Sequence, residues 1–263
     1  MLKLKNKFNQ LNNISMRLFY AFCFLLMFTS CKQNEQHLTK ITAKNIVLDS
    51  TIQNAQQIND AVSPYKEKLI KEMQQVLSYT PKDLVKNDGE MQSSLGNIMA
   101  DLSIELSNPI HKEKTGENID FAMLNNGGIR SIISAGNITK EDAFKLMPFE
   151  NELVAVELSG DKMIALIKYF IENKKAHPLS KNIALTIKEN DYDLKINGET
   201  FDKNKTYTVV TSDYLQSGGD KMTFFKNPKR LTKLGYKLRT AIIDYFKKVD
   251  TIHATIDNRV IIK

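Results

Sequence analysis

The chain has 263 residues, of which 42% are hydrophobic and 25% charged, a composition typical of a globular domain. Four of its seven net positive charges come from the first 30 residues, which hold four basic side chains and no acidic one. The rest of the chain has no basic block long enough to follow a nucleic-acid backbone, and nothing in the composition suggests a fibre, a disordered protein or a multi-span membrane protein.

The first segment has the pattern of a bacterial export leader. The apolar run from Leu18 to Phe28 is too short for a bilayer-spanning helix, which needs about 20 residues, but it suits the apolar region of a signal peptide. Thr29 and Ser30 then precede Cys31, as in a lipobox, so we predict that Cys31 is lipidated. The alternative is a plain secretory signal with an incidental cysteine, and a start at Met16 would give a more conventional leader.

These features divide the chain into three parts. We predict a lipoprotein signal peptide over residues 1–30, a lipid-anchored polar tether over 31–60 and a folded domain over 61–263. After cleavage Cys31 has no second cysteine with which to pair, which favours acylation. The expected location is the bacterial cell envelope, where the anchored protein faces the periplasm or the cell surface.

Helical periodicity dominates the first half of the domain. It predicts a helix from Ser63 to Tyr79, with Ser63 as its cap and Pro64 at its first position. A second helix is expected over 94–107, ending before Pro109. An apolar strand from Ile119 to Leu124 then leads into a glycine-bearing turn.

Strands and helices alternate less regularly in the second half. A capping box at Thr139 opens a short helix to Met147. A strand over 152–158 is followed by a helix capped by Ser159. Further strands are expected over 183–188, 192–196 and 206–211, with a tight Asn197-Gly198 turn, and a helix near 236–248 precedes a last strand. This order predicts an α+β fold in which a mixed β-sheet is layered with helices.

The residues that would support hydrolysis are not grouped in the sequence. The histidines His37, His111, His177 and His253 are isolated, and none lies in a metal-ligand motif. No nucleophile elbow or phosphate-binding loop is present either. We therefore expect no catalytic residue, no metal site and no cofactor in this chain.

Three short segments have the chemistry of a small-molecule site. Asn125-Asn126-Gly127-Gly128-Ile129-Arg130 combines exposed backbone amides with an amide and a guanidinium, which suit a polar or anionic ligand. Tyr214 lies six residues before Asp220, with Gly218 and Gly219 between them, so a ring and a carboxylate would suit a nucleoside. Phe149 follows a proline at a helix end. Each segment alone is also compatible with an ordinary turn, a solvated arginine or a core aromatic.

Together these segments resemble the C-terminal domain of 5′-nucleotidases and UDP-sugar hydrolases, over roughly residues 63–227. The resemblance rests on four motifs in the family's order, Leu95-Gly96-Asn97-Ile98-Met99-Ala100-Asp101, Asn125 to Arg130, Pro148-Phe149 with Leu158-Ser159-Gly160, and Tyr214 to Asp220. It implies that Phe149 and Tyr214 stack on a base and that Asp220 binds the ribose. Asn125 and Arg130 would supply polar contacts, and the glycines 127, 128, 218 and 219 would shape the loops.

Two departures from the family limit what the resemblance implies. Arginines expected before the Leu-Gly-Asn motif are absent, and Lys86 is a partial substitute. Asn126 replaces a glycine, so it either tightens the turn or places a side chain in the pocket.

The family's N-terminal metallophosphatase domain has no counterpart in this sequence. The resemblance therefore implies a nucleoside- or nucleotide-binding domain of a split 5′-nucleotidase. A separately encoded metallophosphatase partner would supply hydrolysis and the divalent metals. The alternative is a stand-alone lipoprotein that binds nucleosides or nucleotides for uptake or sensing. In both cases the partners are a nucleoside or nucleoside monophosphate and a membrane, reached through the lipid anchor, and not a nucleic acid.

Overall fold

The computed structural model describes residues 16–263, apart from 23, 25–37, 39, 50 and 54. The chain divides into two units, Met1–Asn54 and Ala55–Lys263. The predicted lipidation site Cys31 lies outside the described residues. In the first unit, residues 16–22 are helical and exposed. Within the described part of the chain, no helix has the length and apolar character needed to cross a membrane.

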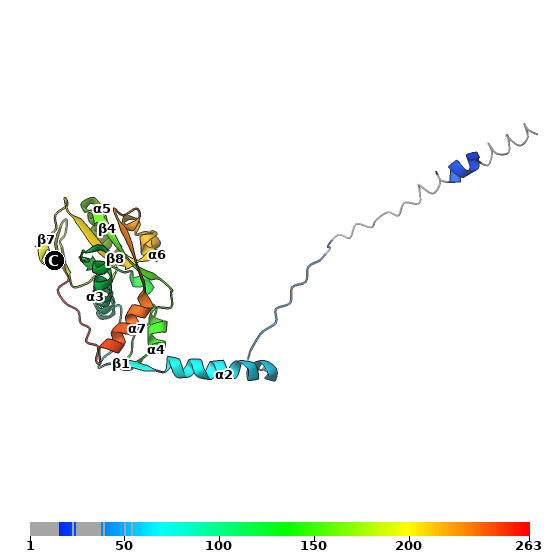
Figure 1. Ribbon diagram of the computed structural model, residues 1–263, viewed down its shortest axis with the longest axis horizontal. Helices are drawn as coiled ribbons and strands as arrows, with labels where there is room; N and C mark the ends of the chain where they lie inside the picture. Colours follow the sequence, from blue (N-terminus) through cyan, green and yellow to red (C-terminus); the bar gives the residue numbers. More distant parts are fainter. Residues whose placement is uncertain (1–15, 23, 25–37, 39, 50, 54) are drawn as a thin grey trace, which may run out of the picture. The chain divides into compact units, whose positions relative to one another are not determined.

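The second unit consists of interspersed helices and strands (Figure 1). Its helices are α2 (Gln56–Met73), α3 (Ser94–Thr115), α4 (Lys140–Leu146), α5 (Gly160–Asn173), α6 (Asp213–Gln216) and α7 (Leu238–Lys248). Its strands are β1 (Val76–Thr80), β2 (Phe121–Ala122), β3 (Gly136–Thr139), β4 (Glu152–Ser159), β5 (Ile183–Ile187), β6 (Tyr192–Ile196), β7 (Glu199–Thr200), β8 (Thr206–Ser212), β9 (Leu231–Lys237) and β10 (Val260–Ile262).

The strands form mixed sheets, as predicted. The central sheet has the order β2-β8-β4-β9, in which β2 and β8 are parallel and the other pairs antiparallel. A second sheet has the order β10-β5-β6-β7, and β1 pairs with β3. The predicted α+β fold class agrees with this architecture.

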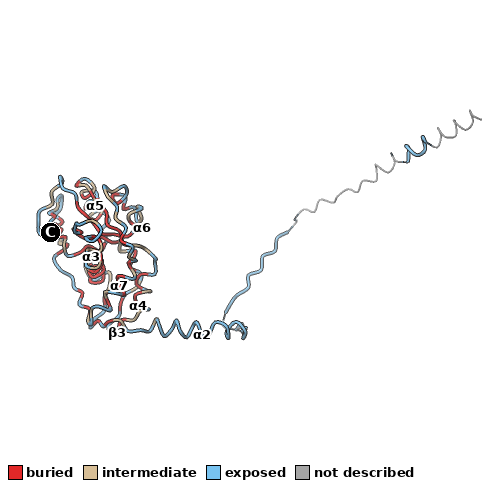
Figure 2. Tube along the Cα trace, in the orientation of Figure 1, coloured by how far each residue is buried: buried red, intermediate tan, exposed pale blue. Residues whose placement is uncertain are grey.

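The central sheet is covered on both faces. Along β4, Leu153 and Ala155 enter a core with α3 and α7, whereas Val154, Val156 and Leu158 enter a core with α5 and the second sheet. A strand buried on both faces needs apolar side chains at successive positions, which explains the run Leu153–Val156. Figure 2 shows α3 as a mostly buried helix and α2 as an exposed one.

The predicted helix over 63–79 is wrong in its bounds. The helix α2 begins at Gln56, so Ser63 is not its cap, and the Ser63 hydroxyl instead donates to the Asn59 carbonyl at 2.7 Å. The chain leaves the helix after Met73 because β1 gains backbone pairing with β3 and a Ser78 hydroxyl bond to Val249. These long-range bonds outweigh a local helical pattern.

Two other elements differ from the sequence predictions, and two local motifs agree with them. The helix α3 continues through Pro109 to Thr115, where Gly116, at φ 78°, accepts the left-handed conformation that ends it. The strand β9, which was not predicted, is largely exposed, and its Gly235 also has positive φ. The capping box at Thr139 and the Asn197-Gly198 turn are confirmed, the turn by positive φ at both residues.

Candidate functional site

A cavity of about 300 Å³ brings together most of the residues selected from the sequence. Three loops line it, one after β2, one after α4 and one from α6 onward. The lining residues are Asn125, Gly127, Gly128, Arg130, Phe149, Asn151, Tyr214 and Asp220. The predicted residues Gly218 and Gly219 are not among the lining residues, and Gly219 lies against the ring of Tyr214, which does line the cavity.

The Asp220 carboxylate is held from two sides. The Asn125 side-chain amide donates to one carboxylate oxygen at 2.7 Å, and the Tyr214 hydroxyl donates to the other at 3.0 Å. Asp220 itself has φ 51° and ψ 26°, a left-handed conformation that aspartate tolerates better than most residues. The loops that carry Asn125 and Tyr214 therefore meet at this one carboxylate.

The two aromatic side chains at the cavity are not core residues. Phe149 is 42% exposed and Tyr214 is 44% exposed. The Arg130 guanidinium lies over the Phe149 ring, 5.9 Å from the ring centroid, and it also donates to the Gly127 carbonyl at 3.4 Å. The sequence alone was compatible with either a ligand-stacking ring or a core side chain at each of these positions. The exposure of both rings favours the ligand-stacking interpretation.

Glycine is required where the loops approach these side chains. A Cβ atom on Gly219 would lie 2.5 Å from the Tyr214 ring, and one on Gly128 would lie 2.7 Å from the Asn125 side-chain oxygen. Gly218 has φ 94°, a conformation that non-glycine residues rarely adopt. The paired glycines thus allow the ring and the amide to take their positions.

Lys86 and Asn126, the two positions at which the sequence departs from the family pattern, both contact backbone carbonyls outside the cavity. The Lys86 ammonium donates to the Ile129 carbonyl at 2.9 Å and is not among the residues that line the cavity. The Asn126 amide points away from the cavity, toward the Lys86 and Ala176 carbonyls at 3.4 and 3.3 Å. It fastens the turn to its surroundings.

Asn151 is a lining residue that was not predicted from the sequence. It lies two residues after Phe149, at the entry to β4. Its proximity to the Pro148-Phe149 motif was the available signal.

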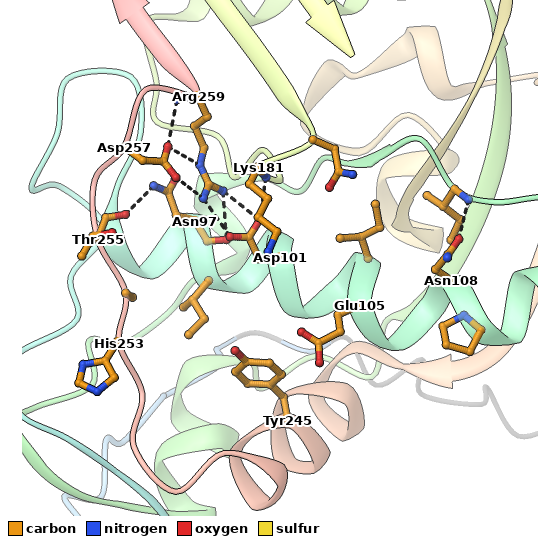
Figure 3. Close-up of a pocket in the computed structure, with 16 residues that line it drawn as sticks. Asn97, Asp101, Glu105, Asn108, Lys181, Tyr245, His253, Thr255, Asp257 and Arg259 are labelled. Atoms are coloured by element: carbon orange, nitrogen blue, oxygen red, sulfur yellow. Dashed lines mark hydrogen bonds and ion pairs between the residues drawn. The ribbon is translucent and has the colours of Figure 1, made fainter. Parts of the chain in front are cut away.

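A larger cavity of about 560 Å³ lies elsewhere on the second unit, against α3 and the C-terminal segment (Figure 3). The Arg259 guanidinium there donates to the Asp101 and Asp257 carboxylates and to the Leu179 carbonyl, at 2.6–3.1 Å. Asn97 donates to Gln92 and to the Thr255 carbonyl, both at 2.9 Å. The Leu-Gly-Asn motif therefore fastens the C-terminal segment to α3.

The histidines contribute no metal cluster among the residues that the structure describes. Within that part of the chain, no three His, Cys, Asp or Glu side chains are grouped so as to hold a metal ion. His111 and His177 are buried at 1% and 3% exposure, and His253 is exposed beside the larger cavity.

Comparisons with known proteins agree with these observations. A family model described as the 5′-nucleotidase C-terminal domain matches residues 76–227. The chain is 34% identical to Protein UshA of Escherichia coli over 136 residues, which cover 50% of this chain and 23% of that protein. It is 25% identical to a 5′-nucleotidase-related protein of Glossina morsitans morsitans over 244 residues, which cover 82% of this chain and 43% of that protein.

A solved structure has a similar fold. The 5′-nucleotidase precursor from Thermus thermophilus superposes with a TM-score of 0.62 at 24% identity, over 78% of this chain and 42% of that chain. The chain thus spans less than half the length of these relatives. Because the family model matches more than half of the sequence, including the three loops of the smaller cavity up to Asp220, the chain belongs to the 5′-nucleotidase C-terminal domain family.

Proposed function

We propose that the 300 Å³ cavity binds a nucleoside or a nucleoside monophosphate. One observation carries this proposal: two half-exposed aromatic rings, Phe149 and Tyr214, line the same cavity as the Asp220 carboxylate. The volume lies at the lower end of the range of about 300–1,000 Å³ that small-molecule sites occupy.

Each part of a nucleoside has a suitable group in the cavity. The flat base would stack on the rings of Phe149 and Tyr214. A carboxylate has roughly four acceptor positions, and Asn125 and Tyr214 use two of those on Asp220. The remaining positions would accept the two ribose hydroxyls, while Arg130 supplies a positive charge for a phosphate.

Hydrolysis, in this proposal, belongs to a separately encoded metallophosphatase that supplies the divalent metals and docks on this domain as one half of a split 5′-nucleotidase. Support comes from the family match, which is to the C-terminal domain. The alternative is a lipoprotein, anchored in the cell envelope through Cys31, that binds nucleosides or nucleotides without catalysis. An adjacent gene for an exported metallophosphatase would favour the split enzyme, whereas an adjacent outer-membrane transporter would favour capture.

Calorimetric titration of the full chain with adenosine, AMP and UMP tests the binding. Phe149→Ala and Tyr214→Ala are each expected to weaken binding by about 1–3 kcal/mol, or roughly 5- to 150-fold, through lost stacking. Tyr65→Ala is the matched control, because Tyr65 is an exposed aromatic on α2, away from the cavity.

A phosphate-release assay with AMP and Mn²⁺ or Zn²⁺ accompanies the titration. Binding without release supports a substrate-holding domain. Release by the pure chain that a chelator abolishes would contradict the assignment of hydrolysis to a partner. No binding of any of the three ligands would contradict the proposed function itself.

A further inference from the structure

One buried histidine lies directly behind the nucleoside cavity. His177 belongs to the segment between α5 and β5 and is 3% exposed. Its ring Nδ1 accepts a hydrogen bond from the Asn126 backbone amide at 3.2 Å. No role for His177 was predicted from the sequence, and none of the cavity-lining groups described above depends on it directly.

The same segment holds the strand that leads into the Asn125 loop. The Pro178 carbonyl accepts from the Leu124 amide at 3.0 Å, and the Ser180 hydroxyl accepts from the Ala122 amide at 2.9 Å. Arg259 and Asp101, visible in Figure 3, fix the far end of the segment through the Leu179 carbonyl and the Lys181 amide. His177 is therefore carried by a rigid support.

From His177, two short paths lead to Asp220. Through Nδ1 it fixes the amide of Asn126, the neighbour of the Asn125 that donates to the Asp220 carboxylate. Its ring packs against Tyr169, with centroids 5.6 Å apart, and the Tyr169 hydroxyl donates to the Asp220 carbonyl at 2.7 Å. His177 thus contacts the residue next to Asn125 and the tyrosine that donates to the Asp220 backbone carbonyl.

The hydrogen bond from Asn126 requires a neutral imidazole. Because Nδ1 accepts, the ring proton is on Nε2, which is buried and has no hydrogen-bond partner among the described residues. Burial lowers the pKa of His177 to about 4, the Asp220 charge acts in the opposite direction, and Lys175 lowers it further. Burial also raises the pKa of Tyr169, so its hydroxyl remains a donor.

We propose that His177 is a positioning residue for ribose recognition, which holds the Asp220 carboxylate in place through Asn126 and Tyr169. This inference rests on the proposed nucleoside site. His177 then affects only the part of the binding free energy that comes from the ribose hydroxyls. The part that comes from base stacking depends on Phe149 and Tyr214.

Adenosine and 2′,3′-dideoxyadenosine separate these two parts of the affinity. We expect His177→Leu to weaken adenosine binding about tenfold, the loss of one hydrogen bond to a charged group, and to leave dideoxyadenosine binding within about twofold. His177→Asn is expected to restore the preference for adenosine over dideoxyadenosine. The asparagine side-chain oxygen is as many bonds from the backbone as Nδ1 of histidine, so it can accept the hydrogen bond from the Asn126 amide. His177→Gln, whose amide lies one atom further out, should not restore it.

The alternative outcomes are distinct. An equal loss for both ligands, or an unchanged preference in His177→Leu, would overturn the inference. His253→Leu replaces an exposed histidine and is the matched control.

Hydrogen exchange at the Asn126 amide tests the positioning without any nucleoside. The amide is expected to exchange at least about tenfold faster in His177→Leu than in the unsubstituted chain, and at the original rate in His177→Asn. Unchanged exchange in His177→Leu would overturn the inference even if nucleosides bind. If the unsubstituted chain binds no nucleoside, the proposed function and the ribose role fail together, and the exchange rates still decide whether His177 fixes the loop.

Discussion

The cavity beside Arg259 and the cavity beside Asp220 differ in how many hydrogen-bonding positions their side chains leave unused. In the larger one, the Arg259 side chain is only 4% exposed and donates to two carboxylates and to backbone carbonyls. In the smaller one, Asp220 keeps acceptor positions, and two aromatic rings are more than 40% exposed. The Arg259 side chain beside the cavity of about 560 Å³ thus has its donors paired within the protein, whereas the Asp220 carboxylate in the cavity of about 300 Å³ keeps acceptor positions for a ligand.

Cavity volume alone therefore does not identify a binding site. Buried polar groups that satisfy one another stabilise the fold and have nothing left with which to bind a ligand. Exposed rings next to an incompletely used carboxylate have both apolar surface and hydrogen-bonding capacity to offer. Substitutions in the first cavity should therefore change stability, and substitutions in the second should change affinity.

The largest expected effect is on stability. Arg259→Ala should lower the free energy of unfolding by about 3 kcal/mol. Breaking a buried ion pair costs about 3–5 kcal/mol, and the lower value applies here because the Asp101 and Asp257 carboxylates are partly exposed to water. Denaturant unfolding measures this change. Lys181→Ala is the control, since it removes an exposed charge and keeps the backbone amide bond to Asp101. A loss below about 0.5 kcal/mol for Arg259→Ala would contradict the structural role of the cluster.

An effect of similar size is expected from pH. His177 has a pKa of about 4 in the folded chain against 6.5 in the unfolded chain, so between these values the unfolded chain binds more protons. Stability should therefore fall as the pH drops from 6.5 to 4, by about 3 kcal/mol from this group. Comparing the unfolding free energy of the unsubstituted chain with that of His177→Asn isolates this contribution. Parallel pH profiles would argue against a buried neutral histidine.

A smaller effect is expected on affinity when the open carboxylate is neutralised. Asp220→Asn should weaken adenosine binding about tenfold, or about 1.5 kcal/mol, because the ribose loses hydrogen bonds to a charged acceptor. Dideoxyadenosine binding should stay within about twofold. Asp161→Asn, an exposed aspartate at the start of α5, is the control for the change in charge. A change in unfolding free energy without a change in adenosine affinity would mean that Asp220 stabilises the fold, as the Arg259 cluster does, and does not bind the ribose.

The smallest effect concerns a single hydroxyl. Tyr214→Phe keeps the ring but removes the donor to Asp220, which lies 3.0 Å away, and should weaken adenosine binding about threefold. Tyr192→Phe on β6 is the matched control. A loss as large as that of Tyr214→Ala would mean that the hydroxyl, and not stacking, provides the contribution of Tyr214.

The motifs that line the smaller cavity could be selected from the sequence because each is a short segment with its own local chemistry. The turn at Asn125, Phe149 after a proline, and Tyr214 with its following glycines need only a few neighbours in the chain to be identified. Their arrangement around one cavity followed from the family resemblance. The capping box at Thr139 and the Asn197-Gly198 turn were predictable for the same local reason.

What the sequence did not indicate depends on partners far away in the chain. His177 meets Asn126 across 51 residues, and Arg259 meets Asp101 across 158 residues. Likewise, the helical pattern at Val76 gives way to a strand through pairing with Thr139 and its neighbours. Periodicity and motif spacing describe a segment and its nearest neighbours, so they contain no information about such contacts.

Amide chemical-shift mapping of the full chain during titration with adenosine tests most directly which cavity is the binding site. We expect the shifts to concentrate at residues 125–130, 149–151 and 214–220, around Asp220. Shifts that concentrate instead at residues 97–108 and 253–259, around Arg259, would contradict this assignment.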